Sequence, residues 1–124
     1  MEKEFVNYEI ALELKELGFN EPCIGFWWNN KDFTEPEFLL EYCEHVMDGN
    51  LKRPTFSQTF AFFREKYGYD VTIKKCTPSE FKFEIEQLFA KGNNHYFIDF
   101  PFKSHKEAEL KCIDKLIETV KRKV

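Results

Sequence analysis

Residues 55–68 read TFSQTFAFFREKYG, and this stretch predicts the most regular helix of the chain. Thr55 and Gln58 have the spacing of a capping box, in which each residue satisfies a backbone N–H group of the other at the start of a helix. Behind the box, large rings recur every three or four residues, as one face of a helix requires: Phe56, Phe60, Phe63 and Tyr67. We expect this stripe to be buried, Phe60 and Phe63 above all, because an apolar helical face needs a core to pack on.

The residues that follow predict three antiparallel strands joined as a meander. Strands are expected over 71–75, 81–86 and 96–100, and in the middle one apolar and charged residues alternate strictly. Residues 77–80, TPSE, offer a competing interpretation, since they have the composition of a helix cap for a helix over 81–89. The alternation favours the strand.

Helices are also predicted near both ends of the chain. Residues 7–17 place apolar side chains on one helical face, with Asn7 as N-cap and Gly18 at the C-terminal stop. Residues 104–107, SHKE, form a second capping box, and a broad apolar face follows over 105–122.

The segment between these regions gives weaker signals. Residues 24–28 read as a short strand that ends at the turn Asn29-Asn30. Residues 34–37, TEPE, have the composition of a helix start, and apolar side chains at helical spacing follow before Gly49: Phe38, Tyr42 and Val46. We therefore expect a helix here.

These elements together predict an α+β fold. Residues 1–124 are expected to form a single domain, because 124 residues is close to the commonest domain size. Its order is α-(β)-α-β-β-β-α, with a small antiparallel three-stranded sheet, one extra short strand, and helices packed on one face of the sheet.

Charge and cysteine content exclude several classes of function. The net charge is −4, with 22 acidic and 18 basic residues and only three arginines, so binding to duplex nucleic acid is not expected. The four cysteines form no C-x-x-C pair, and we expect reduced thiols and no metal site. The charged first residues and the lack of a long apolar run predict no secretory signal and no membrane span, hence a cytoplasmic protein.

Three segments stand out as a set. Residues 5–23 contain ELGFNEPC, residues 55–68 contain FFREKYG, and residues 106–118 read KEAELKCIDKLIE. Together they resemble a widespread family of small uncharacterised phage and prophage proteins of gut bacteria. The resemblance covers under half of the chain and implies a viral or mobile-element origin, with the host cytoplasm as the place of action. It implies no catalytic residue, and residues 28–52 depart most from the family pattern.

The helix–strand–strand–strand–helix order of the second half also resembles the double-stranded RNA-binding fold. Topology alone does not fix function. Domains of that fold place lysines at the start of their last helix against phosphates. Here residues 103–109 read KSHKEAE, with carboxylates between the basic residues, which disfavours RNA binding.

The strongest candidate for a binding site is an aromatic strand followed by two side-chain amides. Two consecutive tryptophans on a strand face opposite sides, so at least one of them is a candidate for stacking on a ligand. The alternative is that one tryptophan fills the core and residues 38–47 cover the other. The predicted binding residues are Trp27, Trp28, Asn29 and Asn30, with Arg53 and Arg64 as charged partners. For Arg64, the competing interpretation is an ordinary solvated helix face.

No sequence motif nominates an enzyme, and no catalytic residue or cofactor is predicted. We expect a non-enzymatic phage accessory protein that acts by binding and interferes with host antiviral defence through a host protein. Two alternatives stay open at this point: a sponge-like binder of a small nucleotide signal, and an RNA-binding module of double-stranded RNA-binding topology. An exposed apolar patch would favour a protein partner, and a concave pocket with convergent polar groups would favour a small ligand.

Overall fold

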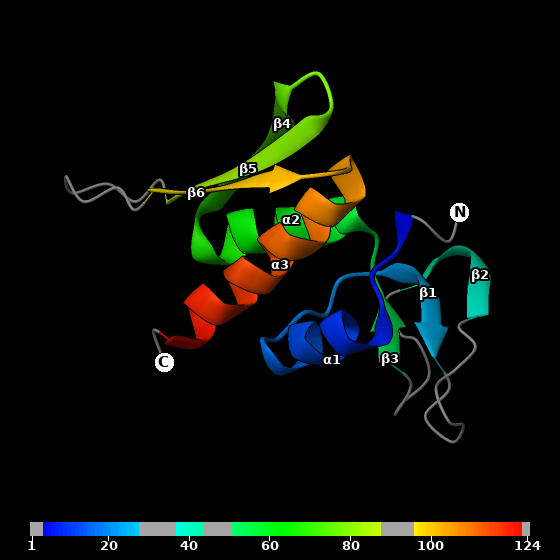
Figure 1. Cartoon of the computed structure of the whole chain (residues 1–124). Helices are drawn as coiled ribbons and strands as arrows, with labels where there is room; N and C mark the ends of the chain where they lie inside the picture. Colours follow the sequence, from blue (N-terminus) through cyan, green and yellow to red (C-terminus); the bar gives the residue numbers. More distant parts are fainter. Residues whose placement is uncertain (1–3, 28–36, 44–50, 88–95, 123–124) are drawn as a thin grey trace. The chain divides into compact units, whose positions relative to one another are not determined.

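The structure is a computed structural model that describes residues 4–27, 37–43, 51–87 and 96–122 (Figure 1). In chain order its elements are α1 (Tyr8–Glu16), β1 (Cys23–Trp27), β2 (Glu37–Cys43), β3 (Leu51–Arg53), α2 (Phe56–Tyr67), β4 (Tyr69–Thr77), β5 (Glu80–Gln87), β6 (Tyr96–Phe102) and α3 (His105–Arg122). The chain divides into two compact units, Met1–Thr59 and Phe60–Val124, and α2 crosses their boundary. That residues 1–124 fold as a single domain stays a prediction.

Helix α1 begins and ends where the sequence predicts. The Asn7 side chain accepts a hydrogen bond of 2.9 Å from the Ile10 backbone N–H group, which confirms the N-cap. At the other end, Gly18 has a positive φ of 94° and the Phe19 N–H group donates to the Leu14 carbonyl. This geometry is typical of a helix that stops at a left-handed residue, which glycine adopts without a steric penalty.

The first unit also holds a three-stranded antiparallel sheet in the order β2-β1-β3. The strand predicted over 24–28 is confirmed as β1 up to Trp27. The helix predicted from residue 34 onward is wrong over Glu37–Cys43, which forms strand β2. Antiparallel pairing with β1, with Phe38 opposite Gly25, decides this, because tertiary pairing overrides a short helical pattern.

The second unit contains the predicted meander. Strands β4, β5 and β6 form an antiparallel sheet in that order, and α2 and α3 lie on the same side of it (Figure 1). The α+β fold class is therefore confirmed, with one more small sheet than the sequence predicted. The strand predicted over 81–86 is also confirmed, within β5, and the part of the alternative helix at 88–89 lies outside the described residues.

The predicted capping box of α2 forms in both directions, whereas at α3 the Glu107 carboxylate accepts from the Lys103 N–H group at 3.1 Å. The Gln58 N–H group donates to the Thr55 hydroxyl, and the Thr55 N–H group donates to the Gln58 side-chain carbonyl, each at 3.0 Å. At α3, the Glu107 N–H group donates to the Ser104 hydroxyl at 3.1 Å. The Gln58 amide also donates to the Pro22 carbonyl at 2.7 Å, so the α2 cap fixes the start of β1 as well.

The core of the second unit is built from α2, α3 and the sheet. Phe63 is fully buried, whereas Phe60 is only half-buried, so the expectation of a buried Phe60 is wrong. On α3 six side chains are buried: Ala108, Cys112, Ile113, Leu116, Ile117 and Val120. No helix in the described ranges is long and apolar enough to cross a membrane.

Candidate binding site

Two of the six predicted binding residues, Trp27 and Arg53, lie together inside the first unit. The guanidinium carbon of Arg53 is 5.2 Å from the centre of a Trp27 ring and 5.6 Å from the centre of the Phe5 ring. Arg53 Nε donates to the Val6 carbonyl at 2.8 Å, and Tyr8 meets the indole edge-on. Both predicted residues are buried, so this cluster packs neighbouring strands together and presents little surface to a ligand.

The structure describes one further predicted binding residue, Arg64. Arg64 is exposed on α2, in the second unit. Trp28, Asn29 and Asn30 lie outside the described residues. A binding role for the six residues stays a prediction.

Strand β6 carries a surface that the sequence analysis did not single out. Four large apolar side chains on it are exposed, with Phe100 62% and Tyr96 54% accessible, and Phe97 and Ile98 join them. Asp99 is the only charged residue in the strand. We call residues 96–100 the β6 edge, because among the described strands β6 pairs only with β5.

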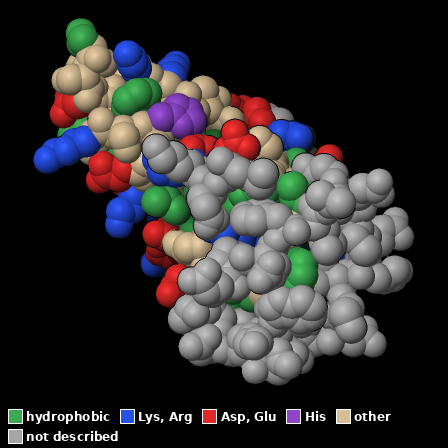
Figure 2. Space-filling model, turned by 90° about the vertical axis from the view of Figure 1, so that its right-hand side faces the viewer, with side chains coloured by type: hydrophobic (Ala, Val, Ile, Leu, Met, Phe, Trp, Pro, Cys, Tyr) green, Lys and Arg blue, Asp and Glu red, His purple; other side chains and the backbone are tan. Residues whose placement is uncertain are grey.

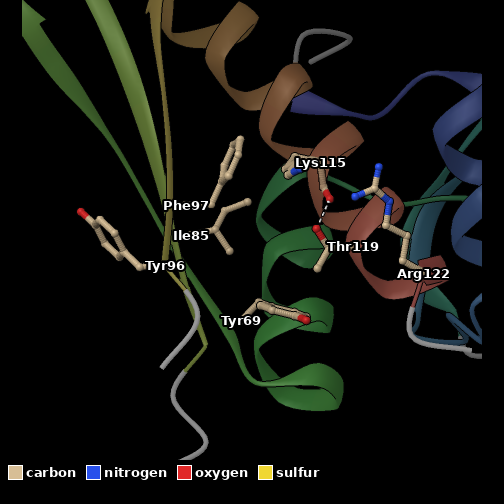
Figure 3. Close-up of a pocket in the computed structure, with 7 residues that line it drawn as sticks. All are labelled: Tyr69, Ile85, Tyr96, Phe97, Lys115, Thr119 and Arg122. Carbon is tan, nitrogen blue, oxygen red and sulfur yellow. Dashed lines mark hydrogen bonds between the residues drawn. The ribbon is translucent and has the colours of Figure 1, made fainter. Parts of the chain in front are cut away.

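The two faces of the β6 edge have different surroundings. Phe97 pairs with Ile85 of β5, its ring centre lies 5.9 Å from that of the buried Phe83, and Lys115 Nζ of α3 lies 4.3 Å above its ring. Phe97 therefore faces α3. Tyr96 points to the opposite side of the sheet, as Figure 3 shows, in keeping with the alternation of side chains along a strand.

A polar cluster covers the sheet face opposite α3. The Tyr96 hydroxyl donates to the Glu84 carboxylate, and Lys74 and Lys82 lie 3.3 and 3.9 Å from the same group. The hydrogen bond from Tyr96, followed by the nearby lysines, lowers the pKa of Glu84, and the same bond raises the pKa of Tyr96. Through this bond Glu84 of β5 holds the Tyr96 side chain of the β6 edge.

On the α3 side, a cavity of about 310 Å³ adjoins the β6 edge (Figure 3). Its apolar wall comes from the sheet, with Ile85, Phe97 and Tyr69, and its polar wall from α3, with Lys115, Thr119 and Arg122. Tyr96 also borders it, although its ring points away. The cavity is thus apolar on one side and cationic on the other.

The two cations beside this cavity share one carboxylate oxygen. Arg122 Nη2 lies 2.7 Å and Lys115 Nζ 3.9 Å from Oε1 of Glu118. The three charges sum to +1, so the α3 wall of the cavity is cationic on balance. The Thr119 hydroxyl donates to the Lys115 carbonyl at 2.7 Å, within the helix.

The opposite edge of the same sheet has other chemistry. Strand β4 carries three exposed charged residues, Asp70, Lys74 and Lys75. Charged side chains on an edge strand, lysines above all, are a common device against pairing with another chain. The β6 edge carries one exposed charged residue, Asp99, and no lysine, so β4 is the more strongly protected of the two edges.

The hairpin turn of β4 and β5 adjoins the start of α3, the region that the RNA-binding resemblance addresses. The rings of Phe81 and His105 meet edge-on at 5.8 Å. Glu109 lies 3.2 Å from both His105 and Lys106, and Figure 2 shows acidic and basic side chains intermixed around a histidine. The basic groups here are largely compensated, which disfavours a phosphate-binding surface.

The buried cysteines Cys23 and Cys112 are poor candidates for a nucleophile or a metal ligand. Burial raises the pKa of the Cys23 thiol to about 12 and raises that of Cys112 further. A thiol in this state is a poor nucleophile and a poor metal ligand. Among the residues that the structure describes, no group of three or more His, Cys, Asp or Glu side chains is placed to hold a metal ion.

No protein-family model matches the chain, and no curated protein or solved structure matches it either. A binding site at the β6 edge is therefore inferred from the geometry of the structure. The sequence does contain a signal for it: residues 96–102 read YFIDFPF, with apolar side chains at odd and even positions, whereas β5 alternates. A strand that is apolar on both faces needs cover on both, or a partner.

Proposed function

We propose that this protein is a non-enzymatic accessory protein that binds another protein by accepting an extended segment of it along the β6 edge. The single observation that carries the proposal is the run of exposed apolar side chains on an edge strand, Tyr96 to Phe100. Following the resemblance to phage proteins, the partner is a host protein, and the consequence of binding is interference with host defence in the cytoplasm.

Strand addition is the mode of binding that suits this surface. An edge strand presents a row of backbone N–H and C=O groups that an extended peptide satisfies, and its side chains give specificity. The contrast between the two edges of the sheet supports the choice of β6, because β4 carries the charges that discourage pairing. Exposed rings at the edge add apolar contact area, as in the centres of protein interfaces.

A small nucleotide is the second candidate, and the cavity beside α3 is the observation that favours it. Rings on one wall and cations on the other suit a planar anion. The cavity of about 310 Å³ is at the low end for ligand pockets, and both cations already contact Glu118. We therefore place this function behind protein binding.

The test uses the full chain as bait in a lysate of the encoding organism's host, beside two variants. Ile98→Lys puts a charge in the β6 edge, and Lys111→Glu is the control because Lys111 is exposed on α3 and does not line the cavity. We expect a captured protein that the Ile98→Lys variant loses and the Lys111→Glu variant keeps. The captured protein, once purified and added to the chain, should slow hydrogen exchange of the backbone amides of β6.

Two outcomes would overturn the proposal. One is a captured partner that the Ile98→Lys variant still binds with equal affinity. The other is a dimer of the chain in sedimentation equilibrium that Ile98→Lys dissociates, because a second copy would then occupy the edge.

A further inference from the structure

A strand added to β6 would direct every second side chain to the side of the sheet on which the cavity lies. Phe97 faces α3, and side chains of a strand paired with β6 alternate between the same two faces. Every second residue of the bound segment would therefore be directed to the side of the sheet where Lys115, Thr119 and Arg122 line the cavity (Figure 3).

We propose that the segment bound along β6 carries a side-chain carboxylate, which Lys115 and Arg122 receive. This inference rests on the proposed function and names the chemistry of its partner. Lys115 is 27% and Arg122 74% exposed at the side chain, so both are accessible to a ligand in solution. Their balance with Glu118 leaves one positive charge, which a carboxylate of the partner compensates.

The surroundings of the two cations favour an acid over other polar groups. Lys115 Nζ is held above the Phe97 ring, 4.3 Å from its centre, so its charge is already placed beside the strand. Arg122 offers a planar group that matches a carboxylate in two hydrogen bonds. Asp99 is the acid of β6 itself, opposite Phe83 on the face toward α3, so the carboxylate is expected opposite Phe97, away from Asp99.

The other residues of the segment follow from the same alternation. Positions that face away from α3 meet Tyr96 and Ile98, which are exposed and suit apolar side chains. The expected ligand is thus an extended segment with an acidic residue on one face and apolar residues on the other.

The experiment selects binders from an mRNA-displayed library of random peptides, whose C-termini are blocked by the amide bond to the puromycin linker, against the full chain and against Lys115→Glu. We expect the full chain to enrich peptides with an acidic residue at a fixed position between apolar ones. Binding of such a peptide should weaken about tenfold or more with Lys115→Glu or Arg122→Glu and stay unchanged with Lys111→Glu. Exchanging the acid of the peptide for lysine should restore binding to Lys115→Glu.

The outcomes separate this inference from the proposed function. If no selected peptide loses binding with Ile98→Lys, the proposal of strand addition at β6 is wrong, and so is the inference of a bound carboxylate. If peptides bind the edge but show no acidic preference, or if Lys115→Glu leaves their affinity unchanged while the variant melts like the full chain, only the inference fails. Synthetic peptides that bind the edge only with a free C-terminus, tested beside their amidated forms, would also overturn it, because the carboxylate would then come from the chain end.

Discussion

Arg53 shows how a charged side chain is accommodated almost entirely inside the first unit. Its guanidinium lies over the rings of Phe5 and Trp27, and its Nε donates to the Val6 carbonyl. A buried cation needs hydrogen-bond acceptors and favours aromatic faces, and this cluster supplies both. The same chemistry that made Arg53 and Trp27 candidates for a ligand site therefore suits a structural contact between β1, β3 and the N-terminal segment.

We predict that Arg53→Ala destabilises the protein by about 2 to 4 kcal/mol, because it removes the ring contacts and leaves the Val6 carbonyl without this donor. Urea unfolding followed by circular dichroism measures the effect. Lys52→Ala is the matched control on the same strand, since the hydrogen bonds of Lys52 Nζ to Asn20 and Glu21 lie at the surface. Its effect should stay below about 1 kcal/mol. Equal effects of the two changes would contradict a structural role for Arg53.

At the scale of the element, α2 combines a strong local signal with uneven burial. Its reciprocal cap between Thr55 and Gln58 fixes where the helix begins. Of the ring stripe, Phe56 and Phe63 are buried, whereas Phe60 is half-buried, and Phe62 from outside the stripe is buried as well. The helix thus presents its rings to the core over a broader and slightly rotated face than the spacing indicates.

This rotation predicts unequal effects of two similar truncations. Phe63→Ala should destabilise the protein by about 3 to 5 kcal/mol, because it opens a cavity around a fully buried ring. Phe60→Ala should cost less than about 2 kcal/mol, because part of that ring is already in water. Thermal and urea unfolding of both variants measure the difference. A larger effect at Phe60 would show that the helix faces the core as the spacing alone suggests.

At the scale of the whole molecule, basic and acidic side chains are mixed near the start of α3, whereas four of the five large exposed apolar side chains among the described residues lie on β6. The described basic residues near the start of α3 have acidic neighbours, with Glu109 3.2 Å from both His105 and Lys106. The exposed apolar side chains gather on β6 instead. The order α2-β4-β5-β6-α3 is the one seen in double-stranded RNA-binding domains, yet its surface chemistry suits a protein segment better than a phosphate backbone.

We therefore predict that the chain binds double-stranded RNA weakly or not at all at physiological salt. A 20-base-pair RNA in a gel-shift or fluorescence-polarisation titration tests this, with the salt raised from about 50 to about 200 mM to expose any electrostatic contribution. The variant Glu107→Lys with Glu109→Lys is the informative comparison, because it removes the carboxylates between the basic residues. Submicromolar, salt-sensitive binding by the unchanged chain would contradict the prediction.

Local sequence signals specify those features of the fold that depend on residues close together in the chain. The caps at Asn7, Thr55 and Ser104 and the alternation over 81–86 are local, because a cap joins residues three apart and a strand pattern repeats every second residue. These signals were enough for α1, α2, α3, the β4–β6 meander and the α+β class.

The remaining features depend on contacts between segments that are distant in the sequence. Residues 37–43 have helical spacing yet form β2, because β1 offers them backbone partners, and β3 is too short to carry a pattern of its own. Burial of Trp27 and Arg53 depends on residues such as Phe5 and Val6, far away in the sequence. The exposure of Tyr96 to Phe100 depends on β6 being the last described strand of its sheet. Which strand lies at the edge of a sheet is set by pairing between distant segments, so a local sequence pattern does not specify it.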